Sequence, residues 1–129
     1  MDFSTMKSAA DAFCETNDCA VKAVALATGE DYGATRWLFT EFGRRPRHGT
    51  PVHITKKVMD YLGYDMVECR DWFDARTIRS LEPEITSTGS YLVRTSRHIL
   101  CVKNGVVEDW TRGRLHRIIN VWRVKKKEA

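Results

Sequence analysis

The chain has 129 residues, of which 43% are hydrophobic and 29% charged, with a formal net charge of +4. This length is that of one ordinary domain, which can bury enough surface to fold without a disulfide bond or other covalent cross-link. No apolar run approaches the ~20 residues that a helix needs to cross a bilayer, so we expect no membrane anchor. The first residues lack a basic start followed by an apolar core, and the four cysteines contain no CxxC pair, so we expect a cytoplasmic protein with reduced thiols.

The first informative segment is NDCAVKAVALATG, residues 17–29. It predicts a helix that is entered through a polar cap and closed by Gly29. The helix is apolar almost all round, with Lys22 as its only charge, so we expect it to lie buried in the middle of the fold. Cys19 would then sit at the positive end of the helix dipole, where a thiol ionises more readily.

Two further helices are expected before residue 64. Residues 31–42 place apolar side chains on one helical face, with Asp31 as the cap and Gly43 as the stop. After them, Thr50 would supply a capping hydroxyl ahead of Pro51 at the first position of a third helix that ends at Gly63.

In the remainder of the chain the spacing of apolar residues changes from a helical to a strand-like period, which predicts mainly strands. The expected elements are a strand over 64–68, a helix over 74–81 ended by Pro83, a strand at 91–93, a hairpin starting at His98, and a last strand over 118–124. The fold class is therefore α+β, with helices before an antiparallel sheet in one domain over 1–129. Residues 125–129 are expected to form a flexible basic tail.

Asn104-Gly105 is a strong signal for a two-residue hairpin turn, and it fixes the register of the hairpin. Counting back from this turn pairs Leu100 with Asp109 and places Asp109 on the same face as His98, one diagonal away. Glu108 would point to the opposite face. The register thus selects Asp109 as the carboxylate that orients His98.

Cys19, His98 and Asp109 are the residue types of a thiol-based acyl-transfer site. A thiolate attacks an acyl carbon, a histidine holds and returns the proton, and a third polar residue fixes the histidine. The backbone N–H of Cys19 and the side-chain amide of Asn17 are the candidate donors for the oxyanion. Asp18 is expected to cap the helix rather than to act in catalysis.

A basic loop lies between the second and third predicted helices and could contact a substrate or a phosphate. Its cations are Arg44, Arg45 and Arg47. The remaining histidines, His48, His53 and His116, are expected at the surface. A zinc site built from Cys14, Cys19, His48 and His53 is disfavoured, because the stretch between Cys19 and His48 is too long and too helical for a finger. No metal or cofactor is expected.

The chain resembles small papain-like cysteine peptidase domains related to bacteriocin-processing peptidases and often encoded by bacteriophages. The resemblance rests on NDCAVKAVALATG, on the following helix with Tyr32, on the loop GRRPRHGTP, and on GSYLVRTSRHILCVKNGVVEDW. It implies a central helix that carries the cysteine at its N-terminus and packs on a sheet that supplies histidine and then aspartate. Many papain-like enzymes carry a glutamine several residues before the nucleophile, whereas Phe13 and Cys14 occupy that region here.

The leading hypothesis is a cysteine peptidase or isopeptidase that acts on a protein or peptide. The same residues could instead transfer the acyl group to an amine or deamidate glutamine. A further alternative is a phage-encoded binding module without turnover, which would engage a host protein or, less favoured, nucleic acid through its arginines.

Overall fold

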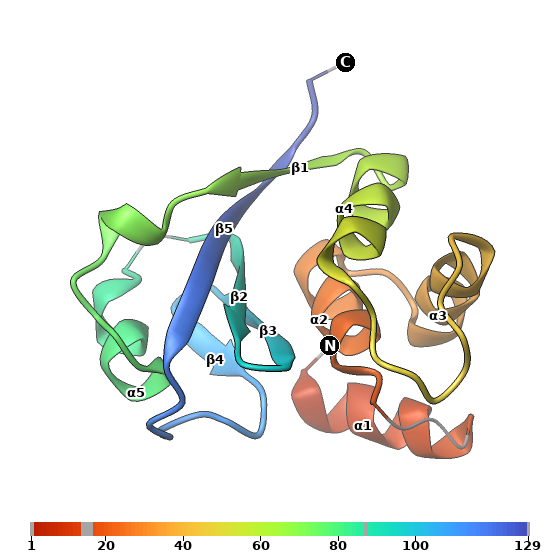
Figure 1. Cartoon of the computed structure of the whole chain (residues 1–129), viewed down its shortest axis with the longest axis horizontal. Helices are drawn as coiled ribbons and strands as arrows, with labels where there is room; N and C mark the ends of the chain where they lie inside the picture. The colour runs from red at the N-terminus through yellow and green to blue at the C-terminus, as the bar shows by residue number, and fades with distance from the viewer. Residues whose placement is uncertain (1, 14–16, 87, 129) are drawn as a thin grey trace.

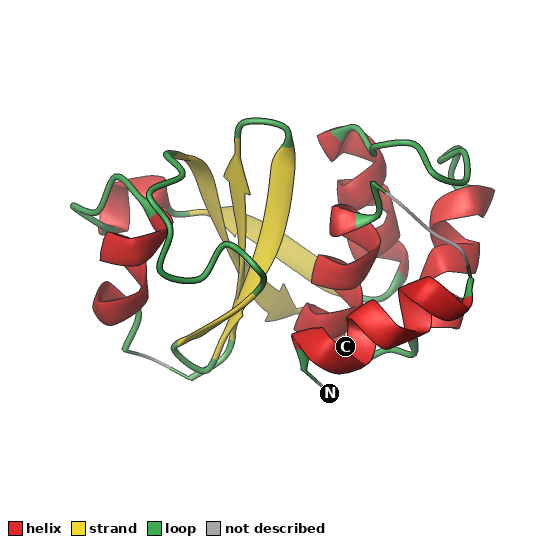
Figure 2. Ribbon diagram, turned by 90° about the horizontal axis from the view of Figure 1, so that it is seen from below, coloured by secondary structure: helices red, strands yellow, loops and turns green. Residues whose placement is uncertain are grey.

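The structure is a computed structural model that describes residues 2–13, 17–86 and 88–128, and it confirms an α+β fold. A single antiparallel sheet stands between two layers of helix (Figures 1 and 2). Helices α1 to α4 cover one face, and the short helix α5 covers the other. Within the described ranges, no helix is long and apolar enough to span a membrane.

The helical layer is built from the first half of the chain. Its members are α1 (Phe3–Ala12), α2 (Cys19–Thr28), α3 (Tyr32–Glu41) and α4 (Val52–Tyr61). Helix α2 begins and ends as predicted, with Gly29 closing it in the left-handed conformation. Asp31 caps α3 as predicted, since its carboxylate accepts a hydrogen bond from the N–H of Ala34 at 3.0 Å.

The sheet is built from the second half. Its strands are β1 (Tyr64–Glu68), β2 (Ser90–Thr95), β3 (His98–Lys103), β4 (Val106–Glu108) and β5 (Ile118–Lys126). Their spatial order is β1-β5-β2-β3-β4. Asn104 and Gly105 both have positive φ, as a type I′ turn requires, and the β3–β4 register is the predicted one, with Cys101 opposite Glu108.

The alternation of side chains along the strands creates two cores. Leu92, Cys101 and Trp122 face the helical layer, where they pack against the buried side of α2. Val93, Leu100 and Val121 face the other way and pack against α5 (Ile78–Leu81). Helix α2 is therefore enclosed by the sheet on one side and by other helices elsewhere, which explains why seven of its ten residues are buried.

Four details differ from the prediction. Helix α1 was not predicted, and the helix expected over 74–81 is only Ile78–Leu81, capped by Thr77 and followed by a 3-10 turn at Glu82–Glu84. Helix α4 begins at Val52 with Pro51 as the N-cap, so Thr50 does not cap it. Lys125 and Lys126 do not belong to a tail, because they pair with Asp65 and Tyr64 of β1 and extend the last strand.

Candidate active site

Cys19 is the first residue of α2 and lies directly beside the start of β3. The backbone N–H groups of Ile99 and Ala20 lie near its sulfur and act to lower the pKa of the thiol. At the other end of the helix, the ammonium of Lys103 donates to the carbonyl oxygen of Leu26 at 3.1 Å. Helix α2 therefore contacts strand β3 near both of its ends, and these contacts position the thiol beside the hairpin.

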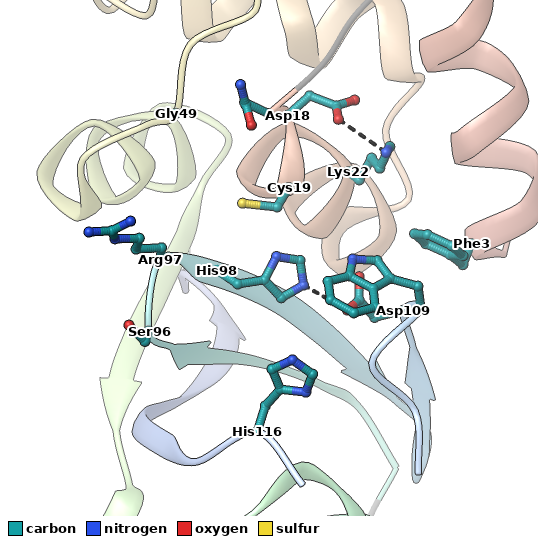
Figure 3. Close-up of a pocket in the computed structure, with 12 residues that line it drawn as sticks. Phe3, Asp18, Cys19, Lys22, Gly49, Ser96, Arg97, His98, Asp109 and His116 are labelled. Atoms are coloured by element: carbon teal, nitrogen blue, oxygen red, sulfur yellow. Dashed lines mark hydrogen bonds and ion pairs between the residues drawn. The ribbon is translucent and has the colours of Figure 1, made fainter. Parts of the chain in front are cut away.

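His98 and Asp109 meet as the hairpin register predicts. Nε2 of His98 lies 2.7 Å from Oδ2 of Asp109, and both side chains are largely buried (Figure 3). The same carboxylate oxygen accepts hydrogen bonds from the hydroxyl of Thr111 at 2.6 Å and from its N–H at 3.2 Å. Glu108 turns to the opposite face and accepts from the N–H of Phe3 at 3.0 Å. Asp109, and not Glu108, therefore orients the imidazole.

The thiol of Cys19 lies close enough to His98 for each group to shift the pKa of the other, so the three side chains form one cluster. Because Nε2 of His98 is held by Asp109, Nδ1 is the ring nitrogen that remains for the thiol. The sequence predicted that these residues belong to one site but could not establish that Cys19 and His98 lie together. In the structure both residues line the same two cavities.

Electrostatics favour the charged forms of this pair. Burial raises the pKa of Cys19, but hydrogen bonds from His98 and the N–H of Ile99, with the positive charge of His98, outweigh it and lower the pKa. Burial lowers the pKa of His98, but the hydrogen bond and charge of Asp109, together with Cys19, raise it to about 9. Both shifts act in the direction that favours a thiolate beside an imidazolium over the neutral pair.

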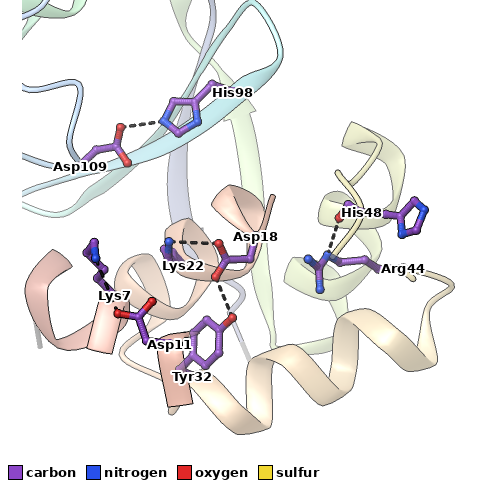
Figure 4. Close-up of polar contacts among 9 residues, drawn as sticks. All are labelled: Lys7, Asp11, Asp18, Lys22, Tyr32, Arg44, His48, His98 and Asp109. Atoms are coloured by element: carbon purple, nitrogen blue, oxygen red, sulfur yellow. Dashed lines mark hydrogen bonds and ion pairs between the residues drawn. The ribbon is translucent and has the colours of Figure 1, made fainter. Parts of the chain in front are cut away.

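Asp18, predicted to cap α2, precedes the nucleophile but makes no side-chain cap bond. Its buried carboxylate turns away from the helix start, accepts from the hydroxyl of Tyr32 at 2.7 Å and pairs with Lys22 at 3.0 Å (Figure 4). The prediction was wrong because a buried phenol and an ammonium one helical turn away hold the carboxylate instead. This leaves the first N–H groups of α2, including that of Cys19, uncapped by this side chain.

The contact between Tyr32 and Asp18 gives a stability prediction. Tyr32→Phe removes a buried hydrogen bond to a charged group and is expected to lower the free energy of unfolding by about 1.5–3 kcal/mol. Urea denaturation measures the change, and Tyr61→Phe, at a side chain that is 66% exposed, is the matched control. Equal midpoints for the two variants would contradict the role given to this bond.

Asn17 lies next to the site, with a positive φ of 54°. Its Nδ2 donates to the carbonyl oxygen of Arg47 at 3.2 Å, and the residue lines the same cavity as Cys19 and His98. The amide has two N–H groups, so one remains after this bond. The loop that carries Arg47 therefore holds Asn17 near the thiol.

Of the three arginines predicted to contact a substrate, one is buried within the basic loop. Arg44 is only 3% exposed, and its Nε donates to the carbonyl oxygen of His48 at 3.0 Å, so it closes the loop from inside rather than meeting a substrate (Figure 4). Arg45 and Arg47 are exposed but line neither cavity beside Cys19. Two other arginines, Arg94 and Arg97, line the site instead.

Two cavities flank the contact between Cys19 and His98. The first, of about 420 Å³, lies on the side of Asp109, Trp110 and His116. The second, of about 490 Å³, lies between the first turn of α4 and the β2–β3 turn. Both are lined by Cys19 and His98, so a substrate could extend to either side of the thiol.

Trp110 and His116 were not identified from the sequence as site residues. The indole of Trp110 lies 5.3 Å from the His98 ring and 5.4 Å from the ring of His116, between centroids. Trp110 follows Asp109 directly, which was the available signal. The sequence offered no such signal for His116. Its position depends on a contact between distant segments, in which the N–H of Ile78 donates to its carbonyl oxygen. His48 and His53 are exposed as predicted.

The other described cysteines differ from Cys19. Burial raises the pKa of Cys69, and it raises that of Cys101 to about 12. Within residues 2–13, 17–86 and 88–128, no three His, Cys, Asp or Glu side chains are grouped to hold a metal ion. Cys14, a member of the disfavoured zinc set, lies outside those ranges.

Comparison with protein-family models, with curated proteins and with solved structures finds no match to this chain. The observations on the site are therefore those of this molecule alone. They define an α+β protein in which a half-buried thiol lies between two cavities, beside an imidazole that is hydrogen-bonded to a carboxylate.

Proposed function

We propose that the protein is a cysteine hydrolase, a peptidase or isopeptidase of papain-like type that acts on a protein or peptide. The observation that carries this proposal is the chain of contacts from Cys19 to His98 to Asp109, with a lowered thiol pKa and a raised imidazole pKa. The placement of the thiol at the start of a central helix supports the papain-like assignment.

In this proposal, the thiolate of Cys19 attacks the carbonyl carbon of an amide. The negative oxygen that forms accepts hydrogen bonds from the N–H of Cys19 and from the remaining amide N–H of Asn17. His98 gives its Nδ1 proton to the leaving nitrogen as the C–N bond breaks, which leaves a thioester on Cys19. Water then attacks the thioester while His98 takes its proton, the C–S bond breaks, and the carboxylic acid leaves as the thiolate of Cys19 and the imidazolium of His98 are restored.

Asp109 acts through His98 in this cycle. Its carboxylate holds the ring orientation and stabilises the imidazolium, while Thr111 fixes the carboxylate. Acyl transfer to an amine and glutamine deamidation would use the same groups, and identification of the product distinguishes them from hydrolysis.

One observation favours the second candidate function, a binding protein with little or no turnover. Part of the Asn17 amide is already committed to the carbonyl oxygen of Arg47. Loss of one oxyanion donor lowers the catalytic rate by about 10²–10³-fold. If the remaining N–H of Asn17 does not point at the oxyanion, the thiol would be reactive but catalysis would be weak. The intracellular role would then be recognition of a host protein.

A burst experiment with p-nitrophenyl acetate tests acyl transfer without knowledge of the substrate. We expect a burst of about one p-nitrophenolate per protein from acylation of Cys19, followed by slower turnover. Cys19→Ser should abolish the burst, whereas Cys69→Ser, at a buried thiol outside the site, should retain it. A wild-type protein that shows no burst would refute the hydrolase proposal.

A further inference from the structure

The cavity beside the first turn of α4 has a positive character that the proposed reaction does not require. Its lining includes Arg94 and Arg97, and none of its described lining residues is acidic. Arg97 is exposed in the β2–β3 turn, next to His98, and its guanidinium lies on the same side of the site as the sulfur of Cys19 (Figure 3). No ion pair joins Arg97 to a described carboxylate.

Arg94 is held in place by a neutral group. Its Nη1 donates to the side-chain oxygen of Asn120 at 2.7 Å, so its position is fixed while its charge is not cancelled. A fixed guanidinium at a cavity wall is suited to binding a carboxylate, because the side chain loses little freedom when the ligand arrives.

The opposite wall of the cavity adds two polar features. The first turn of α4, a ten-residue helix, borders the cavity through Pro51 and Val52, and no side chain caps it. Its free N–H groups carry the positive end of the helix dipole. Thr50 lines the same cavity, and its buried hydroxyl hydrogen-bonds to none of the described residues. This hydroxyl is a donor without a described acceptor at the cavity wall.

The two arginines, the uncapped start of α4 and the hydroxyl of Thr50 are three separate features of this cavity, which we call the arginine cavity. From them we propose that the arginine cavity binds a carboxylate of the substrate. The peptide that Cys19 attacks would thus carry an acidic side chain beside the reacting carbonyl. This inference rests on the proposed function for the identity of the substrate as a peptide. The binding of a carboxylate next to the thiol can be tested independently of it.

Iodoacetate and iodoacetamide form a matched pair of probes for this test. The thiolate displaces iodide from the same methylene carbon in both, but only iodoacetate carries a carboxylate. Mass spectrometry gives the second-order rate constant of each reagent at Cys19. The ratio of the two rate constants measures how strongly the site favours a negatively charged reagent over a neutral one. The imidazolium of His98 contributes equally in every variant that retains it.

Arg97→Gln and Arg94→Gln are each expected to lower the ratio of iodoacetate to iodoacetamide rates by about two- to fivefold, the effect of one solvent-screened charge. Arg97→Lys should retain most of the ratio. Arg79→Gln, which removes an exposed arginine from α5 on the other face of the sheet, is the control and should leave the ratio unchanged.

The outcomes separate the two proposals. If Cys19 reacts rapidly with both reagents but the ratio is the same in Arg97→Gln, Arg94→Gln and Arg79→Gln, the arginine cavity does not recognise a carboxylate and this inference is wrong. If Cys19 reacts with neither reagent faster than Cys69 does, it is the proposed hydrolase that fails. Far-UV circular dichroism of each variant confirms that a changed ratio does not come from unfolding.

Discussion

Replacing His98 with alanine is expected to abolish the rapid alkylation of Cys19 near neutral pH. The wild-type thiol should react with iodoacetamide at a pH below that of an ordinary thiol, because His98 lowers its pKa. In His98→Ala the hydrogen bond and the positive charge are lost while burial remains, so the pKa moves upward and the midpoint of the labelling profile follows. At about pH 6.5 we expect the rate to fall by about 10- to 100-fold.

Mass spectrometry of the labelled protein over a pH series measures this change for each cysteine separately. Asp109→Asn should give a smaller loss, because the imidazole keeps its contact with the thiol but loses the charge that raises its pKa. His53→Ala, at an exposed histidine of α4, is the control. A labelling profile that is identical in His98→Ala and His53→Ala would show that the thiol and imidazole do not interact.

The second large effect is expected at Leu92, in the core between the sheet and the helical layer. Leu92 is fully buried in β2, the strand that pairs with β3. Leu92→Ala leaves a cavity where α2 packs on the sheet, and we expect the free energy of unfolding to fall by about 2–5 kcal/mol. This is a large part of the ~5–15 kcal/mol that stabilises a typical domain.

Guanidinium denaturation followed by tryptophan fluorescence measures the change. Ile119→Ala provides the control, since this β5 side chain is 45% exposed and its truncation leaves no enclosed cavity. A Leu92→Ala midpoint as high as that of Ile119→Ala would mean that the two layers are not packed as described.

The sequence predicted the part of the site that depends on local structure. A polar entry and Gly29 defined α2, which placed Cys19 at its start, and Asn104-Gly105 defined the register that brought Asp109 to His98. These features are determined by residues close to one another in the chain, so spacing alone was sufficient.

The remaining features of the site depend on contacts between distant segments. Asp18 was assigned to a cap because the cap is a local interaction, but Tyr32 from the next helix competes for its carboxylate. Arg44 resembles its exposed neighbours in sequence, and only the path of the loop buries it. Arg97 lies in a hairpin turn, where a cation is ordinarily a surface residue, and its place beside the thiol arises from the docking of α2 on β3.

The position of β5 has a consequence for how the protein is made. This strand is synthesised after the other four described strands, yet it lies between β1 and β2 in the sheet, so the two parts of the sheet cannot join until it is present. A nascent chain that has emerged as far as Asp109 already contains every proposed catalytic residue but lacks the strand on which β2 is supported. We therefore expect the thiol to acquire its proposed reactivity only after β5 has been synthesised and has joined the sheet.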